Sequence, residues 1–251
     1  MRKYKNRDVL AGAMAILLAV SLAGCCKSNN DESHSLSLLG GVIPGSDVAE
    51  PPVGLGSLVS FRVLASSTVA NTGATSIDGD LGLSPGSAVT GFPPGTVSGS
   101  IYVADATAAT AQSDLTTAFN DAAGRPPGTV VSGDLGGQTL APGVFTASSS
   151  LAISSGDLTL TGLGDSTAVF IFQIPSSLTV TTGRRVILAG GAQASNVYWQ
   201  VGSSATLGTN SFFVGTIMAQ ASITLQTGAS LQGRALARTG AVTMESSIVF
   251  P

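Results

Sequence analysis

The second half of the chain repeats one short pattern, and this repetition constrains the fold more than any other feature. Five segments align: SLAISSGDLTLTG from Ser150, SLTVTTGRRVILAG from Ser177, SATLGTNSFFVGTIMA from Ser204, SITLQTGASLQGRALA from Ser222 and AVTMESSIVF from Ala241. Their starts (150, 177, 204, 222 and 241) are 27, 27, 18 and 19 residues apart. A unit that recurs at this interval is typical of a solenoid of stacked coils. Successive strands of a β-sandwich would not share a local pattern, so the sequence predicts a β-solenoid.

Within each repeat, apolar and small polar residues alternate, which is the period of a β-strand. The apolar positions should point into the solenoid, and they are Leu151, Ile153, Leu178, Val180, Ala205, Leu207, Ile223, Leu225, Val242 and Met244. The residues between them should form an outward column of Ala152, Thr179, Thr206, Thr224 and Thr243. A second column at the following corner would hold Ser155, Thr182, Thr209, Thr227 and Ser246. Such columns can serve structure alone or form a binding surface, and the pattern leaves both possibilities open.

One segment breaks the β pattern. In ATAATAQSDLTTAFNDAAGR, which starts at Ala106, small and apolar residues recur every three to four positions, at Ala108, Ala111, Leu115, Phe119 and Ala122. Gly124 and the following prolines are helix-ending signals. The sequence therefore predicts one α-helix at about 106–124, packed by a narrow apolar stripe along the side of the β structure.

The N-terminus has the pattern of a lipoprotein signal peptide at residues 1–24. Four basic residues precede an apolar stretch from Val9 to Ala23, which is shorter than the ~20 residues that a membrane-spanning helix needs. Leu22-Ala23-Gly24-Cys25 resembles a bacterial lipobox. We therefore expect cleavage before Cys25 and a lipid on its thiol; an ordinary signal peptide followed by a chance cysteine is the alternative.

Residues 25–51 are polar and small, with proline and glycine and no sustained periodicity. We expect them to form a flexible tether between the lipid and a folded domain at 52–251. The tether contains His34, the only histidine, and the only cysteines are Cys25 and Cys26, so we expect no disulfide in the domain. An exported, lipidated chain would lie outside the cytoplasm, anchored to the outer membrane or the cell surface.

The charge of the mature chain argues against a nucleic-acid partner. Removing the leader takes four of 11 basic and one of 14 acidic residues, which leaves seven basic and thirteen acidic residues with no basic run. Nucleic-acid-binding domains carry clustered lysine and arginine instead. We expect contact with the membrane through the lipid on Cys25 alone.

The acidic residues are scattered rather than paired for catalysis. Asp78 and Asp80 flank Gly79, and Asp134, Asp157 and Asp165 each follow a glycine, which is typical of turns. The only histidine lies in the tether, so a Ser-His-Asp arrangement is not available. We expect no catalytic residue, no metal, no cofactor and no small-molecule substrate. A calcium site at the Asp78 turn is a minor alternative.

Several stretches resemble one known family in its order along the chain, from about Val53 to Pro251. They include LGSLVSFRVLASSTVANTGATSIDGDLGLSPG, FNDAAGR, FVGTIMAQASITLQTGASLQGRALA and the closing AVTM. They are similar to the ice-binding-protein-like domains of bacteria, algae and fungi. The resemblance implies a discontinuous, three-sided, right-handed β-helix with a long α-helix along its side. It also implies adsorption to ice through one flat face, whose hydroxyl and methyl groups order water into an ice-like layer.

The resemblance also selects residues for the site. Thr72-Gly-Ala-Thr75 and Thr227-Gly-Ala-Ser230 resemble a short motif on the ice-binding face of some members. With the two columns, the predicted ice-binding residues are Thr72, Thr75, Thr179, Thr182, Thr206, Thr209, Thr224, Thr227, Ser230 and Thr243. Arg184 and Arg185 follow Thr182 and could interrupt the flatness of the face. We expect a monomer whose partner is ice.

A surface adhesin or structural module that binds polysaccharide or cells is the alternative function, because a shared fold does not fix a function. An exposed aromatic platform would favour it. Tyr198 and Trp199 are adjacent in NVYWQV, so one of the two should point outward.

Overall fold

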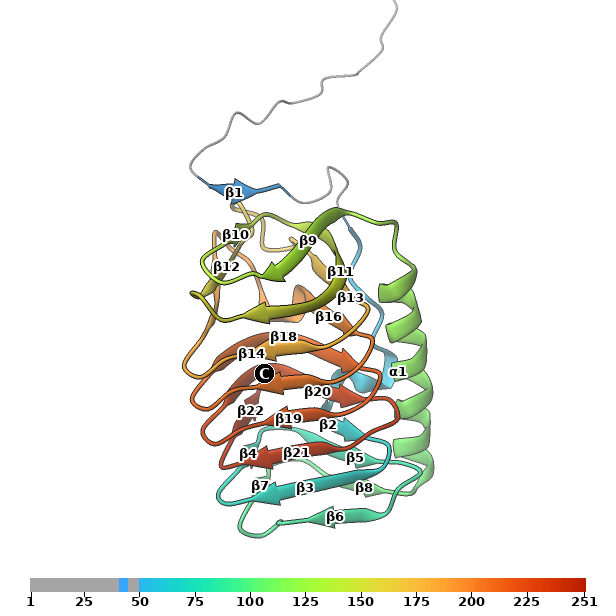
Figure 1. Cartoon of the computed structure of the whole chain (residues 1–251). Helices are drawn as coiled ribbons and strands as arrows, with labels where there is room; N and C mark the ends of the chain where they lie inside the picture. The colour runs from blue at the N-terminus through green and yellow to red at the C-terminus, as the bar shows by residue number, and fades with distance from the viewer. Residues whose placement is uncertain (1–40, 45–49) are drawn as a thin grey trace, which may run out of the picture. The chain divides into compact units, whose positions relative to one another are not determined.

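The computed structural model describes residues 41–44 and 50–251, which form a parallel β-helix with one long α-helix along its side (Figure 1). The helices are η1 (Gly56–Val59), α1 (Ala106–Gly124) and η2 (Ala194–Asn196). The strands are β1 (Val42–Ile43), β2 (Phe61–Ala65), β3 (Thr68–Thr72), β4 (Ser76–Ile77), β5 (Asp80–Leu83), β6 (Ala88–Thr90), β7 (Thr96–Val97), β8 (Ile101–Val103), β9 (Thr129–Asp134), β10 (Thr139–Leu140), β11 (Gly143–Ile153), β12 (Leu158–Thr161), β13 (Phe170–Ile174), β14 (Leu178–Val180), β15 (Val186–Ala189), β16 (Val197–Val201), β17 (Ala205–Leu207), β18 (Phe212–Ala219), β19 (Ile223–Leu225), β20 (Ser230–Ala237), β21 (Val242–Glu245) and β22 (Ile248–Phe250). The predicted solenoid is confirmed.

The β-helix has three sides, each a stack of parallel strands. We call the first side the threonine face: it contains β6, β3, β21, β19, β17, β14, the end of β11 and the end of β9, in this order. The helix-covered face contains β8, β5, β2, the ends of β20 and β18, then β16, β13, β11 and β9. The third face contains β7, β4, β22 and the starts of β20 and β18, followed by the separate sheet of β15, β12, β10 and β1.

The order of coils in space differs from their order in the chain. The chain first builds the coils from β2 to β8, then α1 runs the length of the solenoid and β9 begins the opposite end (Figure 1). The later coils wind back toward the first ones until β20, β21 and β22 pair with β2, β3 and β4. The C-terminal coil therefore lies in the middle of the stack, and the N-terminal coils extend each face beyond it.

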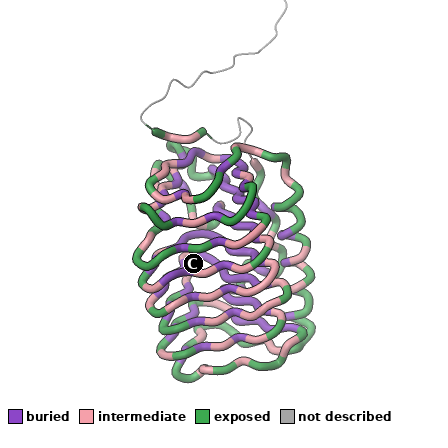
Figure 2. The backbone as a smooth tube through the Cα atoms, in the orientation of Figure 1, coloured by how far each residue is buried: buried purple, intermediate pink, exposed green. Residues whose placement is uncertain are grey.

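The interior is filled by the inward-pointing positions of each repeat. All ten positions predicted to point inward are buried, and Figure 2 shows that buried stretches recur from coil to coil. An aromatic stack crosses four coils: the ring centroids of Phe145 and Phe172 are 5.1 Å apart, those of Phe172 and Trp199 are 3.8 Å apart, and those of Trp199 and Phe213 are 4.8 Å apart. The indole Nε1 of Trp199 donates to the carbonyl of Val214 at 2.9 Å, so its polar group is satisfied inside the core.

Helix α1 spans the residues at which the sequence predicts it. Asp105 caps its start by accepting a hydrogen bond from the Ala108 amide at 2.8 Å. It ends at Gly124 because Arg125 is extended and a proline follows. The five predicted stripe residues are buried, as is Ala118, and all of them except Ala108 belong to the apolar cluster between α1 and the helix-covered face. This face is consequently closed to solvent along the helix.

Part of the segment predicted as a flexible tether belongs to the fold. Val42 and Ile43 form β1, in register with Thr139 and Leu140 of β10. The hydroxyl of Thr129 donates to the Pro44 carbonyl at 2.8 Å, and Arg125 pairs with Glu50 at 3.2 Å. The expected domain start at residue 52 is therefore too late.

The expected signal peptide, the lipid on Cys25, and His34 lie outside the described residues. Among the residues that are described, no helix has the length and apolar character needed to cross a membrane.

Candidate functional site

The threonine face carries the outward column that the repeats predict. Strand register places Ala152, Thr179, Thr206, Thr224 and Thr243 side by side on β11, β14, β17, β19 and β21. Flanking residues of each strand are buried, whereas these residues are partly or fully exposed. Neighbouring parallel strands are ~4.8 Å apart, so the four threonines repeat at that spacing along the solenoid.

The hydroxyl groups of this column are free to interact outside the protein. In the described part of the chain, none of Thr179, Thr206, Thr224 and Thr243 has a side-chain hydrogen bond to another protein group. Each therefore offers one methyl and one hydroxyl group to solvent. The column is not a set of hydroxyls that satisfy one another.

A column of serines at the other edge of the same strands behaves differently. Ser177 donates to Ser150 between hydroxyl groups at 3.0 Å, the hydroxyl of Ser204 accepts from the Ser222 amide at 3.3 Å, and that of Ser222 accepts from the Ala241 amide at 3.2 Å. These serines link successive coils, which is a structural role.

The corner column contains Thr182, Thr209, Thr227 and Thr72, but its register differs from the prediction at one coil. The amide of Gly228 donates to the carbonyl of Glu245, and Glu245 pairs with Thr72, so Glu245 rather than Ser246 stands between Thr227 and Thr72. In the β19 coil, Gln226 and Thr227 separate Leu225 from the corner at Gly228. In the β21 coil, Glu245 alone separates Met244 from the corner at Ser246. Ser246 consequently occupies the left-handed position that Gly228 and Gly73 occupy in neighbouring coils.

Thr75 was predicted to bind ice, and this prediction is wrong. Its side chain is only 1% exposed, and its Oγ1 accepts a hydrogen bond from the Ser247 amide at 3.1 Å. The chain turns the corner at Gly73, after which Thr75 points inward two residues before the buried Ile77. The sequence does contain a signal for the burial of Thr75. Residues two apart in a strand share a side, so Thr75 should point to the same side as the apolar Ile77 of β4.

Ser230 and Arg185 lie around the corner on the third face. Ser230 is paired with Phe212 on β18 and Ile248 on β22, so the prediction that it belongs to the threonine face is wrong. Arg185 forms a bridge with Phe212. Arg184 is 3.9 Å from Asp157. Arg185 therefore lies outside the threonine face and does not interrupt it, contrary to the expectation.

The N-terminal coils extend the threonine face, which the sequence repeats do not reveal. Ala70 of β3 pairs with Thr243, Thr90 of β6 pairs with Ala70, and Asp134 of β9 pairs with Ala152, so the outward column runs from Asp134 to Thr90. Thr90 is exposed. This adjacency results from the reversed order of the coils, and a search for successive repeats cannot find it.

The carboxylates next to glycine serve as turn and coil links. Asp134 accepts hydrogen bonds from the amides of Gly136, Ser154 and Ser155 at 2.8 to 2.9 Å and from the Ser154 hydroxyl at 2.6 Å. Burial acts to raise the pKa of Asp134, but these hydrogen bonds outweigh it and hold the pKa far below its ordinary value. Asp78 accepts from the Ser98 hydroxyl and Asp80 from the Ser100 amide, both at 2.8 Å. In residues 41–44 and 50–251, no three potential metal ligands are grouped together.

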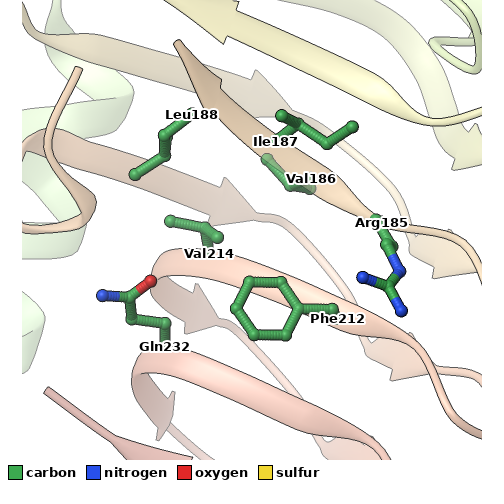
Figure 3. Close-up of a pocket in the computed structure, with 7 residues that line it drawn as sticks. All are labelled: Arg185, Val186, Ile187, Leu188, Phe212, Val214 and Gln232. Atoms are coloured by element: carbon green, nitrogen blue, oxygen red, sulfur yellow. The ribbon is translucent and has the colours of Figure 1, made fainter. Parts of the chain in front are cut away.

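A shallow pocket of about 260 Å³ lies on the third face, where β15 diverges from β18 (Figure 3). Its lining is mainly apolar, with Arg185 and Gln232 at its edge. It contains no carboxylate, and it is smaller than the ~300–1,000 Å³ of ordinary ligand sites.

The aromatic pair in NVYWQV is not exposed. Trp199 lies in the core, and Tyr198 points outward but is 3% exposed beneath α1. Tyr198 therefore does not form an exposed aromatic platform. Such a platform would have favoured polysaccharide binding, the alternative function.

The fold and this face define a class of protein: a rigid β-solenoid that displays a flat, repeated array of methyl and hydroxyl groups. Such a surface fits an extended and regular target better than a small molecule, because its groups repeat along one direction and enclose no volume.

The comparisons with known proteins give the family. The model of the ice-binding-like family matches residues 63–250. An ice-binding protein of Nostoc sp. (strain HG1) is 50% identical over 197 residues, covering 78% of this chain and 72% of that protein. An ice-binding protein of Leucosporidium sp. (strain AY30) is 34% identical over 238 residues, covering 86% and 89%.

Solved structures agree with the relatives. A crystal structure of an ice-binding protein from an Antarctic biological consortium is 54% identical, with a TM-score of 0.82 over 83% of this chain and 95% of that one. That of the Antarctic ascomycete Antarctomyces psychrotrophicus is 41% identical, with a TM-score of 0.77 over 79% and 98%. The chain belongs to the ice-binding-like family.

Proposed function

We propose that this protein adsorbs to ice through the threonine face and acts by adsorption rather than by catalysis. One observation carries the proposal: four threonines in register, Thr179, Thr206, Thr224 and Thr243, have no side-chain hydrogen bond within the described part of the protein. The names of the relatives support the same target.

The mechanism follows from the chemistry of the array. Hydroxyl groups hold water at fixed positions, and the adjacent methyl groups favour a cage-like arrangement of the water around them. Because the strands repeat at ~4.8 Å, the held water is periodic along the solenoid and can merge with a crystal. The rigid backbone has little conformational entropy left to lose on adsorption, so many weak contacts can add up.

The corner threonines Thr72, Thr182, Thr209 and Thr227 would widen this surface by a second column. Thr90 would lengthen it at one end. Thr75 and Ser230 are not part of this surface, because Thr75 is buried and Ser230 lies on the third face.

We also propose that the protein is an exported lipoprotein, anchored through Cys25. The basic residues, the short apolar stretch and Leu22-Ala23-Gly24-Cys25 support this proposal. The chain enters the described fold at β1, which is the last strand of the sheet of β15, β12 and β10. An anchor joined there would leave the threonine face, on another side of the solenoid, available to ice next to the cell surface.

Ice growth under a microscope tests the first proposal. Crystals growing in a solution of residues 41–251, which include β1, should become faceted, and their freezing point should fall below their melting point. Round, freely growing crystals in a well-folded sample would overturn the proposal.

Cell fractionation tests the second proposal. The full chain should be recovered with membranes, and Cys25→Ser should release it from them or block its processing. Recovery of the unmodified protein wholly in the medium would contradict the anchor without affecting the first proposal.

A further inference from the structure

Glu245 stands in the corner column of threonines. It pairs with Thr72 of β3 on one side, and its carbonyl accepts from the Gly228 amide on the other at 3.2 Å. Its side chain is exposed. The column from Thr182 to Thr72 is therefore composed of threonines at every coil except this one.

Among residues 41–44 and 50–251, the carboxylate of Glu245 has one hydrogen-bond partner. Its Oε2 accepts a hydrogen bond from the Thr227 hydroxyl at 2.9 Å. No cation lies within ion-pair distance of it in the described residues. Asp134, near the end of the same face, accepts four hydrogen bonds that hold its charge in the turn. Asp134 pairs with Ala152 at the end of the outward column, so the two columns contain two carboxylates among the described residues. Glu245 is the one that accepts a single hydrogen bond and has its other oxygen left to solvent.

We propose that Glu245 limits the affinity of the threonine face for ice, an inference that rests on the proposed function. A carboxylate holds its hydration water strongly, and bringing it against a crystal that accepts no ion removes part of that water without a compensating cation. The hydrogen bond also directs the Thr227 hydroxyl along the column, toward Glu245 and away from the crystal. A threonine at position 245 would complete the column from Thr182 to Thr72 and free the Thr227 hydroxyl.

Three variants of the full chain test this inference. Glu245→Thr completes the column, Glu245→Gln removes the charge while keeping the length, and Thr209→Glu places a carboxylate at an equivalent position two coils away. The readout is the protein concentration that gives half-maximal inhibition of ice recrystallisation, with circular dichroism as the control for folding. We expect both Glu245 variants to lower this concentration by about tenfold, which corresponds to about 1.4 kcal/mol, and Thr209→Glu to raise it.

The outcomes separate this inference from the proposed function. If the unmodified protein inhibits recrystallisation and neither Glu245 variant improves it, the inference is wrong and ice binding stands. If Glu245→Thr improves it but Glu245→Gln does not, charge is not the limiting property and the inference also fails. Reduced activity in both Glu245 variants would also overturn the inference, because it would identify Glu245 as a favourable contact with ice. If the unmodified protein has no effect on ice, both proposals fall.

Discussion

At the scale of single residues, the corner after the threonine face depends on backbone conformation. Gly183, Asn210, Gly228, Ser246 and Gly73 all have positive φ angles, between 45° and 82°, and they succeed one another from coil to coil. Glycine adopts this conformation without the penalty that a Cβ brings. The corner therefore keeps the same shape in each coil, which aligns the threonines before it.

Gly228→Ala should destabilise the protein by about 1–2 kcal/mol. Gly228 has a φ of 72°, and a Cβ there would meet the side-chain oxygen of Asn210. Urea unfolding measures the effect. Gly124→Ala is the matched control, since a Cβ at Gly124 meets nothing within 4 Å and alanine favours a helix; this variant should be neutral or slightly stabilising. Equal losses in both would contradict the account.

Asp134→Asn should lower the free energy of unfolding by about 1 kcal/mol near pH 6, because an amide accepts the hydrogen bonds from Gly136, Ser154 and Ser155 less strongly. The folded pKa of Asp134 is depressed below its unfolded value of about 3.9. The carboxylate therefore stabilises the fold above pH ~4 and loses this effect as pH falls toward the folded pKa. Unfolding curves at several pH values should show the difference from the unmodified protein narrowing below pH ~4. A pH-independent difference would argue against this role.

Residue positions were predictable where alternation is unbroken. The outward threonines from Thr179 to Thr243 follow from period two, and so would the inward Thr75 if the alternation were continued from Ile77. Ser246 was not predictable in this way, because the β21 coil lacks one residue before its corner. A register shift of this kind is visible only once the neighbouring strands are paired.

At the scale of elements, α1 determines which side of the solenoid remains open. Its buried stripe packs with Phe61, Ile171, Tyr198 and Leu236, so it closes the helix-covered face. The sequence predicts the bounds and the packing of this helix from its spacing of small residues and its end signals. It does not predict which of three sides the helix covers, because that depends on where the connecting chain leaves β8 and enters β9.

Leu115→Ala should destabilise the protein by about 2–5 kcal/mol, since the side chain is fully buried beneath the helix. Thermal unfolding measures the loss, and Thr117→Ala on the exposed side of α1 is the control. Below its melting temperature the Leu115 variant should still shape ice, because the threonine face is on another side. Loss of ice shaping in a folded variant would show that α1 contributes directly to ice contact.

At the scale of the whole molecule, the reversed order of coils joins two distant parts of the chain into one surface. β21 pairs with β3, and β3 with β6, so residues near 70 and 90 continue the outward column that contains Ala152 and the four central threonines. The fold class and the central threonines follow from repeats in the sequence. The full length of the face does not, because nothing local in the chain records that its last coil lies beside its first.

Incorporation of the protein into slowly growing ice tests the central claim most directly, with Thr224→Tyr compared against Thr159→Tyr. Thr224 is in the middle of the threonine face, whereas Thr159 of β12 is a partly exposed threonine on the third face. A bulky ring at Thr224 should hold the face away from the crystal, so this variant should be excluded from ice while Thr159→Tyr is taken up like the unmodified protein. Uptake of the Thr224 variant with exclusion of the Thr159 variant would contradict the account and place the ice-binding surface on the third face.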